Sequence, residues 1–284
     1  MLSFFQALTQ NPFLLAALLA GIASSLASGI IGSYVVVKRI VSISGSIAHS
    51  VLGGMGLCVF LSRTYDWDFL TPLYGALGAG LASALLIGWI NLKYKEREDT
   101  IIAVIWATGM SLGVVFLALT PGYNVELLNF LFGNILWVSQ QDLILLASLD
   151  VIIFAIVLLF YQRFLAICFD EEEALLQGVN VTALYFLLLC LVAISVVLLI
   201  QVVGAILVIA MLAIPAAIAA TMTTKLSHMM IFATILGVLF NFFGIYFSYE
   251  INWPPGATIS LVAVLAYALS LLRKKRQTRL KIAS

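Results

Sequence analysis

Long apolar runs are the feature that most constrains this chain, because a membrane-spanning helix needs about 20 mostly apolar residues. Hydrophobic residues make up 63% of its 284 residues and charged residues 10%. A water-soluble fold cannot bury that much apolar surface. The sequence therefore predicts an all-α integral membrane bundle of about eight to nine transmembrane helices. They are predicted at residues 12–37, 44–62, 70–92, 100–120, 141–162, 180–200, 202–222, 228–249 and 256–272.

One further apolar segment is too short for a span, and the pattern indicates no separate soluble domain. Residues 125–138 are amphipathic and are predicted to form a half-helix at the outer surface. Three cysteines at wide, irregular spacing indicate neither a disulfide framework nor a thiolate metal cluster. The sequence thus predicts a single transmembrane domain over residues 1–284 that ends in a basic tail at 273–284.

The basic residues predict how the chain is oriented in the membrane. If nine spans alternate in direction, every Lys and Arg except Arg63 falls on one side. Cytoplasmic loops are enriched in Lys and Arg, so the C-terminus is predicted in the cytosol and the N-terminus outside. Residues 1–37 contain no basic residue, which predicts a retained first span rather than a cleaved signal peptide. The net charge of +1 gives no indication of a nucleic-acid partner.

Small residues recur within several predicted spans. Lipid gives helices no hydrophobic reason to associate, so close packing depends on small side chains that let two backbones approach. We therefore expect helix contacts at three stripes. They are Ser25, Gly29 and Ser33; Gly75, Gly78, Gly80 and Ser83; and Gly109 and Gly113.

Two ionisable residues lie inside predicted spans, where burial is costly and a functional role is the first hypothesis. His49 follows a Ser-rich stretch that is expected to begin the second span. A helix N-terminus there would favour the neutral imidazole that binds metals, although a packing histidine is the alternative. Asp150 lies in the middle of the fifth span and could contact a cation, a polar neighbour or water. Pro215 should kink or break the seventh span, either for packing or to line a cavity.

A short, well-capped helix is predicted after the fifth span, at about residues 171–177. Asp170 is a good N-cap, acidic residues fill the first turn, and Gly178 is a natural end. Glu173 stands where a capping box would place it. Four acidic residues would be repelled by an anionic cytosolic leaflet, so a protein partner is favoured over lipid headgroups.

Two motifs bear on enzymatic activity. The chain has no G-x-x-x-x-G-K-[ST] segment, so an ATP-driven motor would be a separate polypeptide. Residues 109–113 match the G-x-S-x-G pattern of serine hydrolases, but inside an apolar helix rather than at a strand–turn–helix junction. An intramembrane protease using Ser111 with His49 or His228 stays an alternative. So does an ion-coupled secondary transporter, which would need paired carboxylates where the sequence offers only Asp150.

Five segments, in order, resemble the permease subunits of zinc/manganese-type ATP-binding-cassette importers. They cover the junction of the first two spans, the outer half-helix, the acidic helix, the proline-containing span and the last outer turn. In this chain they are GSYVVVKR with IAHSVLGG (32–54), FLFGNIL (130–136), FDEEEALLQGVN (169–180), VGAIL through IPAA (203–217) and SY through PGATI (248–259).

The resemblance implies a homodimeric permease of the prokaryotic inner membrane that imports a divalent transition metal, zinc or manganese, through a pore along the dimer axis. It implies no permanently bound cofactor and no enzymatic activity of the permease itself. The implied partners are two cytosolic ATP-binding subunits and an extracytoplasmic metal-binding protein. His49 would contact the ion in transit, and the segment at about 164–180 would couple to the ATPase. The implied coupling residues are Asp170, Glu171, Glu172, Glu173, Ala174, Leu175 and Gly178.

The chain departs from the family at one position. Many members carry Asp four residues before this histidine, where both side chains share one helix face and can share a cation. Here that position is Gly45. The usual carboxylate partner of His49 is therefore missing, and Asp150 or a water molecule would have to replace it.

Overall fold

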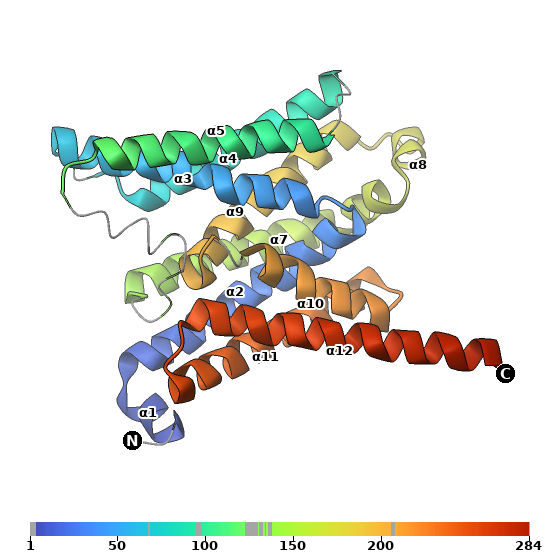
Figure 1. The fold of residues 1–284 in the computed structure, drawn as a ribbon. Helices are drawn as coiled ribbons and strands as arrows, with labels where there is room; N and C mark the ends of the chain where they lie inside the picture. Colours follow the sequence, from blue (N-terminus) through green and yellow to red (C-terminus); the bar gives the residue numbers. More distant parts are fainter. Residues whose placement is uncertain are drawn as a thin grey trace.

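The computed structural model describes residues 4–67, 69–94, 98–122, 138–205 and 208–283, together with Phe130, Gly133 and Ile135. Its described residues are helical and form one bundle of roughly parallel and antiparallel helices (Figure 1). The helices are α1 (Phe4–Gln10), α2 (Pro12–Val37), α3 (Val41–Tyr65), α4 (Pro72–Tyr94), α5 (Glu98–Leu119), α7 (Gln140–Phe169), α8 (Glu171–Leu176), α9 (Val181–Val203), α10 (Val208–Met222), α11 (Leu226–Ile251) and α12 (Pro255–Ala283).

The predicted number of spans is confirmed. Eight of the described helices are long and apolar enough to cross a membrane, and α10 is a shorter apolar helix. The seventh predicted span was placed at 202–222, but α9 continues to Val203 and ends at Gly204, whose φ is 85°. The backbone N–H of Ala205 then donates to the carbonyl of Phe130 at 2.8 Å. Because of this turn, α10 begins only at Val208.

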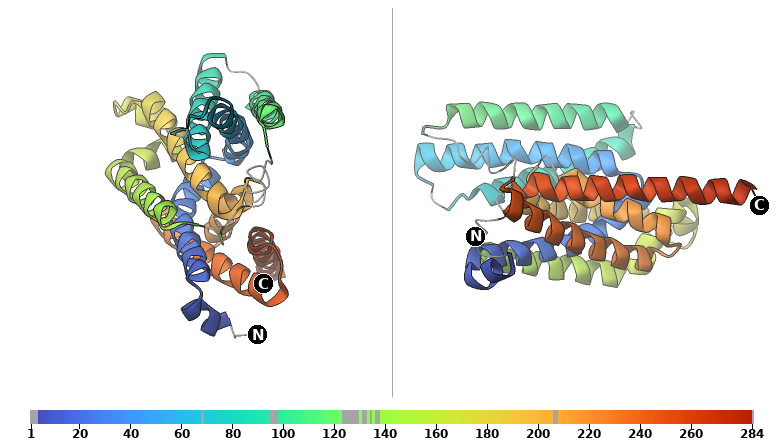
Figure 2. Two further views of the ribbon diagram at one scale, coloured as in Figure 1. Left: turned by 90° about the vertical axis from the view of Figure 1, so that its left-hand side faces the viewer. Right: turned by 60° about the horizontal axis from the view of Figure 1, so that its bottom comes forward.

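Helix α2 occupies the middle of the bundle, with α7, α9, α10 and α11 packed around it. Helices α3, α4 and α5 form a second group beside it, linked through α9 (Figures 1 and 2). The predicted half-helix at 125–138 lies outside the described residues, apart from single positions such as Phe130 and Val138. The bundle therefore consists of a group around α2 and a three-helix group that carries His49.

Several residues of the predicted stripes make very close helix contacts, as expected. A Cβ atom added at Gly29 would lie 2.2 Å from Oγ1 of Thr234 on α11, and one at Gly109 would lie 2.3 Å from Cα of Ser50 on α3. Gly75 faces the backbone of Gly54 equally closely. Gly78 is the exception, because a Cβ there would meet nothing within 4 Å. Its place in the predicted stripe is wrong, since it lies off the face that α4 turns toward α3.

Pro215 does not break its helix, contrary to one of the two expected effects. Helix α10 runs through it without interruption, and the proline is buried. One turn earlier, the carbonyl oxygen of Leu212 would lie 2.1 Å from a Cβ added at Gly32 of α2. Ala216, next to the proline, also faces Gly32. These contacts favour a packing role for Pro215 over the lining of a cavity.

Candidate functional site

His49 lies on α3, within the three-helix group. Its ring stacks on Trp106 of α5, with centroids 4.2 Å apart and planes 9° from parallel. Among the described residues, its buried Nδ1 atom has no hydrogen-bond partner. A buried polar atom without a partner is uncommon in folded proteins, and an imidazole nitrogen is a common ligand of transition metals. The geometry therefore fits a half-buried histidine that can contact an ion.

The expected position of His49 at a helix N-terminus is wrong. Helix α3 begins at Val41, so His49 lies about two turns inside it. The effect of the helix dipole falls off within the first turn, and it does not explain a neutral imidazole here. The serines before His49 are not caps. Ser46 instead donates its hydroxyl hydrogen to the carbonyl of Ile102 on α5 at 2.9 Å, which helps to hold the two helices together.

Gly45 packs against the flexible end of a side chain on α10. It lies one turn before His49, on the same face of α3. A Cβ added there would lie 3.0 Å from Cδ1 of Ile209 on α10. The space that a carboxylate would occupy at this position is therefore partly filled by Ile209. An aspartate would have to displace that side chain.

Asp150 belongs to a different helix contact. It lies on α7, is 5% exposed, and lies near the backbone of Ala27 on α2. Its Oδ1 has no partner among the described residues. The structure thus turns Asp150 toward α2, whereas His49 lies against α5. The part of the chain that is described holds no group of three or more His, Cys, Asp or Glu side chains suited to a metal.

The G-x-S-x-G pattern is explained by packing. Gly109 and Gly113 lie against Ser50 and Leu52 of α3, while Ser111 is exposed on another face of α5. Over the described ranges no hydrogen bond joins Ser111 to a histidine, and His228 is exposed in the first turn of α11. The arrangement lacks the serine–histidine pair that a protease needs.

Helix α8 forms with the predicted start and end. The Oδ1 atom of Asp170 accepts from the backbone N–H of Glu173 at 3.0 Å. Gly178 has a φ of 76°, which suits its role in ending the helix. The expected capping box does not form, because the Glu173 carboxylate accepts from the Gln177 side chain instead. The N–H of Asp170 donates to the carbonyl of Ala166, which continues α7.

The outward face of α8 is apolar at its tip and acidic at its base. Ala174 is buried against the bundle, whereas Leu175 is exposed and Leu176 is 85% exposed. The sequence analysis missed Leu176. Adjacent residues point in different directions on a helix, so α8, with Ala174 on its buried face, must turn Leu175 or Leu176 outward. Here both leucines are exposed.

One end of the bundle carries α8 and most described basic residues. Lys38 and Arg39 follow α2, Lys93 ends α4, and Lys225 precedes α11. All of these positions lie at the end where α8 is found (Figure 1). Arg63 lies in the last turn of α3, at the opposite end. The charge asymmetry that was read from the sequence is therefore a real asymmetry of the fold.

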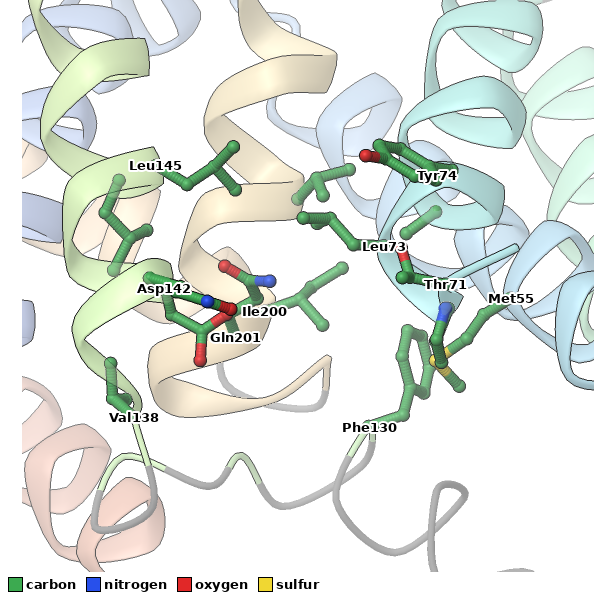
Figure 3. Close-up of a pocket in the computed structure, with 15 residues that line it drawn as sticks. Met55, Thr71, Leu73, Tyr74, Phe130, Val138, Asp142, Leu145, Ile200 and Gln201 are labelled. Atoms are coloured by element: carbon green, nitrogen blue, oxygen red, sulfur yellow. The ribbon is translucent and has the colours of Figure 1, made fainter. Parts of the chain in front are cut away.

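A cavity of about 540 Å³ opens at the end opposite to α8, between the first turns of α4 and α7 and the last turns of α9 (Figure 3). Among the described residues that line it, Asp142 is the only charged one. Its Oδ2 accepts from both the backbone and the hydroxyl of Ser139, at 3.0 and 2.7 Å, so its position is fixed. Gln201 of α9 also lines the cavity, next to Asp142 (Figure 3). Sequence analysis could not find this cavity, because its residues come from distant segments.

The fold and these positions can be compared with known proteins. Residues 10–274 match the ABC 3 transport family. A relative from Chlamydia pneumoniae named "Probable metal transport system membrane protein" is 48% identical over 93% of this chain and 89% of its own length. The "Manganese transport system membrane protein MntC" of Listeria monocytogenes is 33% identical over 96% of this chain and 95% of its own length.

A solved structure has the same fold. The structure described as PsaBC from Streptococcus pneumoniae in complex with Fab aligns with a TM-score of 0.87 and 28% sequence identity, and the alignment covers 99% of both chains. The match extends over the whole bundle and is not limited to single helices. With the family profile covering nearly the whole chain, we conclude that this multi-pass bacterial membrane protein belongs to the ABC 3 transport family and is the permease component of a transporter.

Proposed function

We propose that this permease imports a divalent transition metal, zinc or manganese, as a homodimer driven by two cytosolic ATP-binding subunits. The observation that carries the proposal is the similarity along nearly the full chain to relatives named as metal transport system membrane proteins, including the manganese transport proteins. The unpartnered Nδ1 of His49 supports a metal as cargo. The metal is a substrate in transit, and no permanently bound cofactor is proposed.

The proposed path runs along α3 and α5 at the dimer axis. Helix α5 leaves much of its surface unburied in the single chain, including Val104, Leu112 and Val115. A second copy would cover part of this apolar surface, although lipid would cover it equally well. His49 and Trp106 lie on these two helices. A transport site must release its ion, so one histidine with water and a second copy of itself suffices for transient contact.

The proposed orientation places α8 and the basic end of the bundle in the cytosol, following the positive-inside rule. Segment 164–180 is then the part that docks on the ATP-binding subunit. The docking residues are Asp170, Glu171, Glu172, Glu173, Ala174, Leu175, Leu176 and Gly178. The opposite end, with the cavity beside Asp142, would face an extracytoplasmic metal-binding protein.

The metal role of His49 is tested by His49→Ala in the permease co-expressed with its ATPase and binding-protein partners. We expect uptake of radioactive manganese or zinc to fall by at least about tenfold, since the single protein ligand on the path is lost. Co-purification of the ATPase subunit should be unchanged. The other histidine provides the matched control, because His228 is exposed in the first turn of α11. His228→Ala should transport normally.

Two results would contradict this assignment. Normal uptake of both metals by His49→Ala would remove His49 from the path while leaving the permease function intact. Uptake driven by an ion gradient, by this chain without any ATP-binding subunit, would instead favour an ion-coupled transporter. No observation favours that alternative now, because Asp150 is the described carboxylate in the middle of a span and the described residues hold no group of three or more His, Cys, Asp or Glu side chains suited to an ion.

A further inference from the structure

The cytosolic end of α2 is joined to α8 by one lysine. Lys38 forms an ion pair with the carboxylate of Glu171, in the first turn of α8. Its Nζ also donates to the carbonyl of Ile167, in the last turn of α7, at 2.6 Å. The Lys38 side chain is 13% exposed. A largely buried ammonium group is stable only when it is paired and hydrogen-bonded, so Lys38 holds three helix ends together.

A rigid turn connects Lys38 to the helix that carries His49. The backbone N–H groups of Lys38, Arg39 and Ile40 donate to the carbonyls of Tyr34, Val36 and Val35, at 2.8, 3.2 and 3.0 Å. Arg39 has a φ of 61°, which reverses the chain, and Ile40 is buried. Helix α3 starts at the next residue. At a rise of about 1.5 Å per residue, His49 lies about 12 Å along α3 from that start.

A cavity lies beside this junction. It has a volume of about 520 Å³ and is lined by the turn after α2, the end of α4, the end of α7 and the start of α9. Lys38 and Glu171 both line it, together with Asn91, Cys168 and Thr182. The Lys38–Glu171 pair therefore has space into which it can shift as a unit.

We propose that Lys38 is a positioning residue that passes the movement of α8 to α2 and α3, and hence to His49. This inference rests on the proposed function, in which α8 docks on the ATP-binding subunit. When α8 is displaced, Lys38 either moves with Glu171 or is left as an unpaired, largely buried charge. Leaving the Lys38 charge buried without its partner costs free energy, so the ends of α2 and α8 move together. The Lys38 pair thus couples ATP hydrolysis to the position of the helix on the transport path.

The test uses the whole complex reconstituted in vesicles, with ATP hydrolysis and metal uptake measured on the same samples. Lys38→Gln should retain ATPase binding and hydrolysis while uptake per ATP hydrolysed falls by about tenfold, because α8 can move without α3. Glu171→Lys should lower the same ratio, which is taken per ATP hydrolysed because Glu171 is also one of the proposed docking residues. The exchange variant, Lys38→Glu with Glu171→Lys, restores opposite charges and should recover at least half of the wild-type ratio. Lys38→Arg keeps the pair and should be close to wild type.

The control is Arg39→Gln, which removes the same charge from the neighbouring, exposed residue and should leave uptake per ATP unchanged. An unchanged ratio in both Lys38→Gln and Glu171→Lys would overturn the proposal. Loss of ATPase co-purification in Lys38→Gln would also overturn it, since the lysine would then serve docking. If the wild-type complex takes up metal without ATP, the proposed function itself fails, and this outcome is distinct from either of the others.

Discussion

Replacing Gly75 with alanine should prevent the protein from accumulating in the membrane. A Cβ at this position would lie 2.1 Å from the carbonyl oxygen of Gly54 and 2.8 Å from Sγ of Cys58, both on α3. The nearest atom is backbone and cannot rotate away, so α4 and α3 would have to separate along their contact. Overpacking of this kind costs about 1–3 kcal/mol or more, and the three-helix group that holds His49 depends on this contact.

The matched control lies three residues further along the same helix. Gly78→Ala adds the same methyl group where nothing lies within 4 Å, and alanine is the better helix former by about 1 kcal/mol. We expect at least a fivefold difference in membrane-extracted, monodisperse protein between the two variants, because marginal stability translates into abundance. Equal yields and equal melting temperatures would show that α3 and α4 are not packed through these glycines.

Replacing Leu176 with aspartate should abolish transport by detaching the ATP-binding subunit. This leucine is 85% exposed at the tip of α8, and no other part of the described chain covers it. A hot-spot side chain at the centre of an interface contributes about 2 kcal/mol or more, and a charge there adds a desolvation cost. We expect co-purification of the ATPase and ATP-dependent metal uptake to fall together, by at least about thirtyfold at 2 kcal/mol.

Thr224→Asp is the control for this substitution. Thr224 is exposed in the turn between α10 and α11, at the same end of the bundle. This substitution adds the same charge away from α8 and should leave ATPase co-purification and metal uptake unchanged. The purified Leu176→Asp permease should keep its melting temperature, since Leu176 makes no buried contact. A stoichiometric ATPase on that variant would mean that the motor binds elsewhere and that the docking role of 164–180 is wrong.

Local pattern was sufficient for the elements whose formation depends on neighbours in the chain. Asp170 and Gly178 delimit α8 because a cap and a left-handed glycine act within a single turn. The apolar runs became helices because each is long enough to span a membrane as a helix, in which every backbone group bonds within its own segment. The helix boundaries were less predictable. Helix α7 extends to Phe169 because no residue after Arg163 interrupts it before Asp170.

The candidate site was only half predictable. His49 could be singled out because an ionisable residue in a span is costly, but its partner Trp106 lies on another helix. Asp150, the second ionisable residue singled out in the sequence, is buried on α7 near Ala27 of α2. On a helix that is apolar on every side, the sequence shows no periodicity that marks the buried face. The direction in which a side chain points then depends on which helices pack beside it.

The sequence by itself determined that this chain is an all-helical membrane protein with a charged end and a capped acidic helix, because hydration and hydrogen bonding act residue by residue. Only the tertiary structure decided that Ile209 fills the space beside Gly45 and that Lys38 joins Glu171 to Ile167. It also decided which glycines touch a backbone. These are contacts between segments far apart in the chain, and their geometry depends on how the helices pack.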